Sequence, residues 1–396
     1  MNAHKGLVKK IITSPVFFAL LFFSLLTDCA FADMIDAVRG GRLEIVKNYL
    51  ESDPSWRFYK SDRGWTLLHY AAQSLQVDVA EFLLSQNADV NVRTETNDTP
   101  LSLAVERGNG VWFFEINLPR RKKTIDLLIS HGAQINSLDE AIALDSVEIL
   151  NAIIRNNPES LDNIKKYNAA LDRAAYWGSA RVMSFLLKSH ALAYTSVDLD
   201  EPMISASIFG YNDIVKLLLS YGVDANSKPD NNYTQLYRAV TCGNGKFFVV
   251  YYDPRDGRYQ GVNMQVQFCN PEDYIEIVKM LIAAGANVNV KPEYKTNPMK
   301  GTYPLQIAAI KGWTEMAELL LSAGARAVIN EKDDAYHYTP LHHAAEQGNK
   351  ALVKVLLDNG ADKEIKDDKG RTPLKIAEEK GHGEIIELLR GHRAEE

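Results

Sequence analysis

The sequence predicts an all-α fold, a solenoid of stacked helix pairs that carries one inserted β-hairpin. The first observation is a repeated phrase: TPLHHAAEQG begins at Thr339, and TPLKIAEEKG begins 33 residues later at Thr372. A step of this size is typical of repeat proteins. The second observation is length, because 396 residues exceed what one compact core usually holds. The third is composition, since 46% apolar and 24% charged residues are typical of a folded protein.

Each residue of the phrase has a physical role in a pair of short helices. Thr339 can cap the first helix, because its hydroxyl accepts a free backbone N–H, and proline fits the first helical position. The alanine pair lets the next repeat approach closely, and Gly348 ends the first helix. The second helix, ALVKVLLD, has apolar residues at helical spacing. Gly360 can then end it in the left-handed conformation, and Asn87 and Asn157 occupy the same place in other repeats.

The same phrase recurs along the chain and defines its domain organisation. One helix pair is too small to bury its own apolar face, so neighbouring repeats must stack to form a continuous core. We therefore expect a single repeat domain over residues 33–396, with insertions near residues 109–123 and 243–272. Each insertion lies between the first and second helix of its repeat. The repeats start near residues 33, 66, 99, 136, 169, 201, 234, 303, 339 and 372.

The phrases resemble ankyrin repeats. The resemblance is strong in TLLHYAAQSLQVDVAEFLLSQNADVN, which begins at Thr66, and in TPLHHAAEQGNKALVKVLLDNGAD, which begins at Thr339. It is weaker near residues 136 and 169, where the phrase becomes NSLD and AALD. The resemblance implies that first helices line a concave side, beside the fingers, which we define as the five or six residues before each cap. It also implies that His69 and His342 make structural hydrogen bonds.

Residues 1–32 have the three-part layout of a secretory signal peptide. Three lysines precede the apolar run Ile11–Leu26, and small residues before Asp33 predict cleavage after Ala32. We therefore expect an exported protein, periplasmic or secreted. An uncleaved membrane anchor is the main alternative, although the run is short for a span and contains a proline. Lipidation at Cys29 is a second alternative, which the aspartate before that cysteine disfavours.

The longer insertion contains the predicted β-hairpin. A PRDG turn separates two runs of strand-forming residues. If the turn pairs Asp253 with Arg258, the same register places Cys242 opposite Cys269. An oxidising compartment would then favour a disulfide between these two cysteines. Two buried, unreactive thiols are the alternative for a cytosolic protein.

The shorter insertion brings aromatic residues close to a basic cluster. Such a combination could contact an anionic membrane surface, and it motivates a second function class, a peripheral membrane-organising protein. The interpretation we favour is a strand packed on the solenoid and followed by solvated charges. The candidates for membrane contact are Trp112, Phe113, Arg120, Arg121, Lys122 and Lys123.

No set of residues indicates catalysis, a cofactor or a metal site. His342 and His343 are adjacent, and adjacent residues on a helix point to different sides. The GNG tripeptides of the insertions lack the Lys and Ser/Thr of a phosphate-binding loop. Removing the signal peptide takes away three Lys and one Asp and changes the net charge from −7 to −9. That charge disfavours nucleic-acid binding, so we expect a binding protein whose partner is another protein.

Aromatic residues are the candidates for partner binding, because interface hot spots are rich in Trp and Tyr. They fall on first helices or on fingers. The candidates are Trp65, Tyr70, Tyr176, Trp177, Phe209, Tyr233, Tyr237, Tyr336 and Tyr338. We expect several of them to form an exposed strip. In an exported protein, this strip would bind a secreted or periplasmic partner, for which the chain would be an inhibitor, immunity or accessory protein.

Overall fold

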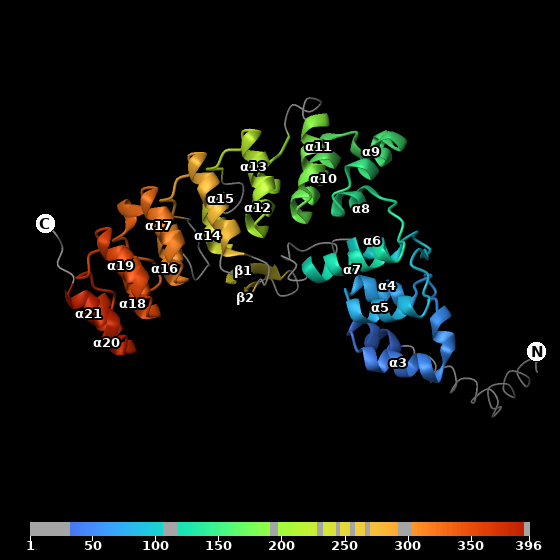
Figure 1. Cartoon of the computed structure of the whole chain (residues 1–396), viewed down its shortest axis with the longest axis horizontal. Coiled ribbons are helices and arrows are strands. Elements are labelled where there is room, and N and C mark those ends of the chain that lie inside the picture. Colours follow the sequence, from blue (N-terminus) through green and yellow to red (C-terminus); the bar gives the residue numbers. More distant parts are fainter. Residues whose placement is uncertain are drawn as a thin grey trace, which may run out of the picture. The chain divides into compact units, whose positions relative to one another are not determined.

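The computed structural model divides the chain into two compact parts, residues 1–140 and residues 141–396 (Figure 1). We call them the N-terminal part and the C-terminal part. The structure describes residues 32–105, 118–190, 197–227, 233–242, 246–253, 258–265, 270–291 and 302–391.

In the N-terminal part, the described elements are helices. First helices pack on first helices, as α4 does on α6, and second helices pack on second helices, as α5 does on α7. This is the arrangement expected of a solenoid. The elements are a helix over residues 32–39, α3 (Leu43–Ser52), the 3₁₀ helix η1 (Pro54–Phe58), α4 (Leu67–Gln73), α5 (Val77–Ser85), α6 (Pro100–Val105) and α7 (Leu118–Ser130), followed by α8 (Leu138–Ala143), which ends in the C-terminal part.

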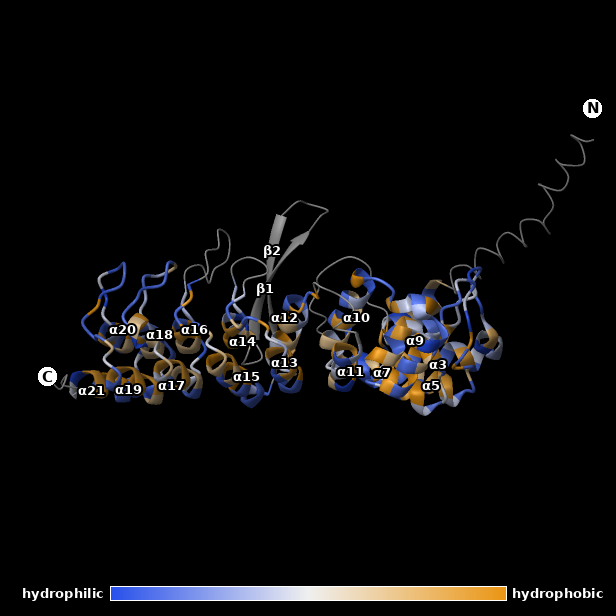
Figure 2. Cartoon of the chain, turned by 90° about the horizontal axis from the view of Figure 1, so that it is seen from above, coloured by the Kyte–Doolittle hydropathy of each residue, from blue (hydrophilic) through white to orange (hydrophobic). Residues whose placement is uncertain are grey.

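The C-terminal part repeats the same helix pair. Its first helices, α10, α12, α14, α16, α18 and α20, form one row, and their second helices form a row beside it (Figure 2). The elements are α9 (Val147–Asn156), η2 (Pro158–Leu161), α10 (Ile164–Trp177), α11 (Ala180–His190), α12 (Asp200–Phe209), α13 (Asn212–Ser220), α14 (Gln235–Cys242), β1 (Lys246–Asp253), β2 (Arg258–Gln265), α15 (Pro271–Ala283), α16 (Pro304–Ile310), α17 (Thr314–Ser322), η3 (Ala325–Val328), α18 (Pro340–Gln347), α19 (Lys350–Asp358), α20 (Pro373–Lys380) and α21 (Gly383–Gly391).

The core lies between neighbouring pairs. In α19, Leu352, Val353, Leu356 and Leu357 are buried, and their spacing places them on one face of the helix. Full burial of each such side chain contributes about 1.5–3 kcal/mol. The alanine pair of α18 is fully buried, and its small side chains let α18 pack closely on both α16 and α20.

Most helix starts follow the phrase. The Thr339 side chain accepts the N–H of His342, and the Thr372 side chain accepts the N–H of Lys375. In both helices proline follows the cap, where its missing N–H removes no helical hydrogen bond.

Three starts lie at other residues than the phrase predicts. Near residue 201 the helix α12 begins earlier, at Asp200, after the cap Leu199. Near residue 136 the cap is one residue later: the Ser137 hydroxyl accepts the N–H of Glu140, whose carboxylate accepts the N–H of Ser137. Near residue 169 the helix begins earlier, at Ile164, after the cap Asn163. Ala169 lies inside this helix, because no proline interrupts it.

The second helices end as expected in most repeats. Gly360 has a φ of 92°, and Asn87 has a φ of 63°, both in the left-handed region. The prediction is wrong for Asn157, whose φ is −136°. Pro158 follows it and starts η2, and a residue before proline avoids the helical region.

The shorter insertion ends earlier than predicted. Because α7 begins at Leu118, residues 118–123 are helical and belong to the second helix of the repeat. Trp112 and Phe113, the aromatic candidates for membrane contact, lie outside the described residues.

The longer insertion contains β1 and β2, between α14 and α15. The strands pair antiparallel with Asp253 opposite Arg258, which is the register that the turn predicts. Cys242 is buried at the end of α14. Cys269 lies outside the described residues, so the disulfide between Cys242 and Cys269 stays a prediction.

The predicted signal peptide lies outside the described residues, except for Ala32, where the first described helix begins. Among the helices that the structure describes, none combines the length and the apolar character needed to cross a membrane. Export and cleavage therefore stay predictions.

Candidate interaction surface

The fingers are held in one conformation by a shared pattern of hydrogen bonds. The first residue of the finger donates its N–H to the carbonyl of the last residue, and its side chain accepts the N–H of that last residue. In the finger Asp367–Arg371 these distances are 2.9 and 2.7 Å. The pattern recurs in Ser61–Trp65, Thr94–Asp98 and Asp333–Tyr338. In these four fingers, the same turn thus holds the finger backbone in one conformation.

In two repeats the histidine of the phrase joins its own cap to the next finger. The Nδ1 atom of His342 accepts the N–H of Thr339 at 3.2 Å, so its Nε2–H can donate to the carbonyl of Arg371, 3.1 Å away in the following finger. His69 bonds to the N–H of Thr66 at 3.0 Å and to the carbonyl of Asp98 at 3.2 Å. Burial lowers the pKa of both histidines, which favours this neutral form.

A glutamine takes the histidine's place in another repeat. The Oε1 atom of Gln306 accepts the N–H of Tyr303 at 2.7 Å. Its Nε2 donates to the carbonyls of Glu331 at 2.8 Å and Tyr338 at 3.4 Å. These are the bonds that His342 makes, so the position needs one acceptor and one donor, and no charge.

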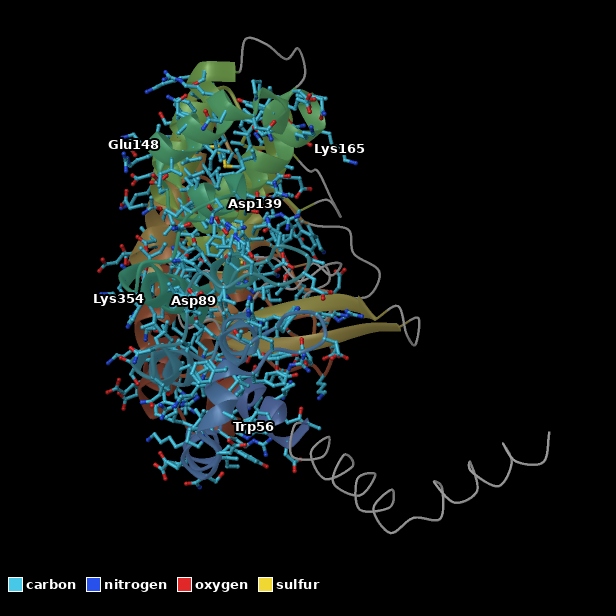
Figure 3. All side chains as sticks on the ribbon, turned by 90° about the vertical axis from the view of Figure 1, so that its right-hand side faces the viewer. Trp56, Asp89, Asp139, Glu148, Lys165 and Lys354 are labelled. Carbon is cyan, nitrogen blue, oxygen red and sulfur yellow. The ribbon has the colours of Figure 1, made fainter. Side chains whose placement is uncertain are left out.

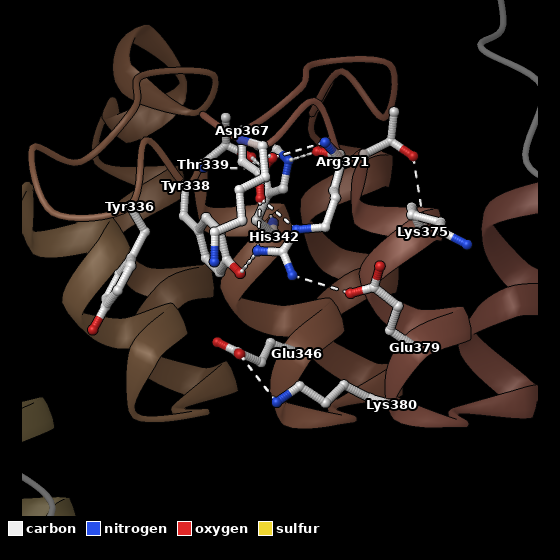
Figure 4. Close-up of polar contacts among 12 residues, drawn as sticks. Tyr336, Tyr338, Thr339, His342, Glu346, Asp367, Arg371, Lys375, Glu379 and Lys380 are labelled. Carbon is white, nitrogen blue, oxygen red and sulfur yellow. Dashed lines mark hydrogen bonds and ion pairs between the residues drawn. The ribbon is translucent and has the colours of Figure 1, made fainter.

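An ionic network fixes the surface of the last two repeats (Figure 4). The Arg371 guanidinium contacts the Asp367 carboxylate at 2.8 Å, the Glu379 carboxylate at 3.0 Å and the Tyr338 hydroxyl at 2.8 Å. These carboxylates raise the pKa of Arg371, which stays charged. Tyr336 is 62% exposed and points away from the network (Figure 4).

The adjacent histidines of the phrase have separate structural roles. His343 Nε2 lies 2.6 Å from the Asp333 carboxylate, and both side chains are buried. Burial by itself raises the pKa of Asp333, but bonds from His343 and from the N–H of Tyr336 outweigh it and lower that pKa. Among the described residues, we find no group of His, Cys, Asp and Glu that could hold a metal ion.

Burial removes five of the nine aromatic candidates from the surface, which corrects the prediction for them. These five are Tyr70, Tyr176, Trp177, Tyr237 and Tyr338. Their rings lie under neighbouring elements: Tyr176 packs on Phe209 with ring centres 5.4 Å apart, and the Tyr237 hydroxyl bonds to Thr302. Of the other four candidates, Tyr336 is exposed, and Trp65, Phe209 and Tyr233 are half-buried.

The prediction of a membrane contact is wrong for Arg121. It is only 5% exposed, and its guanidinium donates to the carbonyl of Ala104 at 2.6 Å. The helix α7 turns this side chain toward α6 and leaves Arg120, Lys122 and Lys123 exposed.

The sequence reasoning missed an aromatic segment, SWRFY at residues 55–59. The Trp56 ring lies between the rings of Tyr49 and Tyr59, with ring centres 6.1 and 5.8 Å apart, beside the N-terminal helices (Figure 3). Burial raises the pKa of Tyr59 to about 12. Phe58 is 84% exposed, the most exposed large apolar side chain of the described residues. The sequence signal that could have predicted this surface is the presence of three aromatic residues among the five residues 55–59.

Comparisons with known proteins place this stack among repeat proteins. A family model of three ankyrin repeats matches residues 34–139, 266–367 and 331–395. The chain is 29% identical over 241 residues to ankyrin repeat protein nuc-2 of Neurospora crassa, which covers 58% of this chain and 21% of that protein. It is 24% identical over 383 residues to a transient receptor potential cation channel subfamily A member 1 homolog of Caenorhabditis elegans. This match covers 88% of this chain and 31% of that protein.

A third relative is much shorter. The chain is 36% identical over 115 residues to cyclin-dependent kinase 4 inhibitor B of Rattus norvegicus, which covers 29% of this chain and 82% of that protein. The two longer relatives are matched over less than a third of their own length. Because the family model matches more than half of the chain, this chain belongs to the ankyrin-repeat family.

Proposed function

We propose that the chain is exported and binds a secreted or periplasmic protein through its fingers and first helices, as an inhibitor, immunity or accessory protein. Ankyrin repeats are interaction scaffolds, and that coarser function follows from the family. The observation that supports the proposal is the fixed finger, which holds Tyr336 exposed beside the Arg371 network. A surface that is ordered before binding loses little conformational entropy when the partner arrives.

The short relative supports the inhibitory part of the proposal. Its name describes an inhibitor of a kinase, and the alignment covers 82% of its length. Nearly the whole of that inhibitor is therefore similar to a piece of this chain. A stack of this kind is large enough to act on an enzyme by binding alone.

Export is tested by producing the full chain in a bacterial host that has a periplasm. We expect the chain in the periplasmic or medium fraction, with a mass that corresponds to a first residue of Asp33. An intact chain in the membrane fraction would favour the anchor, and a chain with acylated Cys29 would favour lipidation.

Binding is tested by cross-linked affinity capture from the exported fraction of the native host. We expect a saturable partner that the wild type retains and that the variants Trp65→Ala and Tyr336→Ala retain poorly. Tyr221→Ala is the control, because Tyr221 is 39% exposed at the end of the second helix α13, away from the fingers. Equal capture by all variants would contradict the proposed surface.

The membrane-organising alternative has less support from the described residues. One residue of its basic cluster, Arg121, is buried, and its guanidinium donates to the carbonyl of Ala104. Flotation with liposomes is the test, and the variant replaces Arg120, Lys122 and Lys123 by Ser. Liposome binding that depends on these three residues would revive the alternative.

A further inference from the structure

Asparagine side chains link the ends of consecutive second helices. The Asn91 amide donates to the carbonyl of Gly132 at 3.0 Å and accepts the N–H of Gln134 at 2.8 Å. Asn226 does the same with Gly285 and Asn287. Asn289 and Asn330 donate in the same way to Gly324 and Gly360. We call this set of bonds the asparagine ladder.

Counted from the cap of the next repeat, Phe58 corresponds to two ladder residues, Asn91 and Asn226. Asn91 lies eight residues before the cap Thr99, and Phe58 lies eight residues before the cap Thr66. A phenyl ring can neither donate nor accept the ladder bonds. Positions where a chain departs from its own structural rule are expected to serve function.

The ring of Phe58 gains no compensating burial. It is 84% exposed, whereas an apolar side chain that stabilised the fold would be covered. Single exposed apolar side chains are common on protein surfaces. Phe58 differs because its neighbours Trp56 and Tyr59 are half-buried rings that extend the apolar surface.

Local contacts hold the segment that carries Phe58. The Asp53 side chain caps η1 by accepting the N–H of Ser55 at 2.9 Å, and Pro54 fixes the first helical position. Trp56 packs between Tyr49 and Tyr59 and holds the segment on α3. Phe58 is therefore presented in a defined position, which lowers the entropic cost of binding.

The charge around Phe58 is opposite to that of the whole chain. Residues 53–65 contain three cations and two acids, a local charge of +1, although the full chain has a net charge of −7. The cations Arg57, Lys60 and Arg63 are exposed. An exposed aromatic ring among cations fits a partner that offers an apolar side chain among carboxylates.

We propose that the Phe58 surface, formed by Trp56, Arg57, Phe58, Tyr59 and Lys60, binds an acidic segment of the partner protein. Phe58 packs against an apolar side chain of that segment, and Arg57 and Lys60 pair with its carboxylates. This inference rests on the proposed function and names the chemistry of the partner. A protein is favoured over an anionic membrane as the occupant, because the ankyrin repeats of this family are protein-interaction scaffolds.

The test uses the full chain and synthetic peptides. One peptide carries leucine between runs of glutamate, a second replaces the leucine by serine, and a third replaces the glutamates by lysine. We expect saturable binding of the first peptide, which weakens with salt and falls about tenfold or more in Phe58→Asn and in Arg57→Glu/Lys60→Glu. Tyr221→Ala is the control and should bind this peptide as the wild type does, because Tyr221 is 39% exposed at the end of α13, outside both proposed surfaces.

The Phe58→Asn variant also separates binding from folding. Phe58 is 84% exposed, and asparagine is the residue type of the ladder, so the midpoint of thermal unfolding should stay unchanged or rise. A marked fall in that midpoint would assign Phe58 a structural role and overturn the inference. So would equal binding of the acidic peptide to the wild type and to Phe58→Asn.

Two further outcomes distinguish the remaining possibilities. Binding to vesicles of equal parts phosphatidylcholine and phosphatidylglycerol that depends on Phe58, without peptide binding, would overturn the inference in favour of a lipid surface. A partner captured from the exported fraction and retained equally by Phe58→Asn would overturn the inference and leave the proposed function standing. Absence of both a captured partner and peptide binding would count against both.

Discussion

The Nε2 atom of His342 lies 3.1 Å from the carbonyl oxygen of Arg371, the last residue of the next finger. On the other side of the ring, Nδ1 accepts the N–H of Thr339 in its own repeat. A neutral imidazole satisfies both groups, whereas the charged form would place an N–H against the N–H of Thr339. Protonation of His342 would therefore keep the bond to Arg371 but lose the bond from the N–H of Thr339.

This relationship predicts a loss of stability on mild acidification. Burial lowers the pKa of His69 and His342 in the folded chain below the value of about 6.5 expected in the unfolded chain. The unfolded chain then binds more protons as the pH falls below about 6.5, so the free energy of unfolding decreases in that range and is constant above it for these groups. Urea denaturation at a series of pH values measures this dependence.

Gln306 suggests the control for this experiment. His342→Gln can keep both hydrogen bonds, and we expect it to stay within about 1 kcal/mol of the wild type at neutral pH and to depend less on pH. His342→Ala should lose about 1–3 kcal/mol, because the Arg371 carbonyl and the Thr339 N–H lose their partner. An equal acid response in wild type and His342→Gln would show that His342 is not the titrating group.

Substitution by alanine is expected to destabilise the fold unequally at two glycines of one repeat, Gly348 and Gly360. Gly348 and Gly360 both have positive φ, 76° and 92°, so alanine costs about 1–2 kcal/mol at either place. A methyl group at 348 would also meet the His382 ring at 2.9 Å, whereas at 360 it would meet nothing within 4 Å. We expect Gly348→Ala to lose about 1–3 kcal/mol more than Gly360→Ala. Thermal unfolding of both variants measures the difference, and equal losses would contradict the packing of His382 on Gly348.

The helix pairs could be predicted because their signals are local. A threonine cap, the proline after it and a glycine at the helix end act within one repeat, so Thr339 and Gly360 are interpretable without any partner. The prediction of a left-handed conformation at Asn157 was wrong because of one further local residue, Pro158, which the repeat pattern does not include.

Exposure could not be predicted in the same way, because it depends on the neighbouring repeat. Tyr237 has the sequence character of a binding residue, yet its hydroxyl bonds to Thr302, which is 65 residues away across an insertion. The exposed position of Phe58 could not be predicted from its own repeat either. Its position is unusual only when compared with Asn91, whose ladder bonds reach Gly132 in the next repeat.

The Arg371 network predicts that substitution of one of its carboxylates, Asp367, lowers the free energy of unfolding much more than substitution of another, Glu379. The Asp367 carboxylate is buried and accepts the N–H groups of Lys369 and Arg371 as well as the guanidinium. Burial by itself raises the pKa of Asp367, but these bonds outweigh it and lower that pKa. Asp367→Asn should therefore lose about 1.5–3 kcal/mol at neutral pH, because an amide cannot replace all of these acceptors.

Glu379 supplies the matched comparison. It contacts the same guanidinium at 3.0 Å but is 41% exposed. Glu379→Gln should lose less than about 1 kcal/mol, as is usual for an exposed ion pair. Urea denaturation of the two variants in parallel measures the ratio, and similar losses would mean that Asp367 does not hold the finger.

The predicted disulfide gives the last test, and it depends on export. Asp253 lies opposite Arg258, and Lys246 lies opposite Gln265. The sequence predicts that the same register places Cys269, which lies outside the described residues, opposite Cys242. Alkylation followed by intact-mass analysis of exported protein should show no reactive thiol until a reductant is added. Reductant should lower the free energy of unfolding by about 3–4 kcal/mol, because the bridge no longer restricts the unfolded chain. Cys269→Ser should be insensitive to reductant, and two alkylated cysteines in untreated exported protein would refute the bridge.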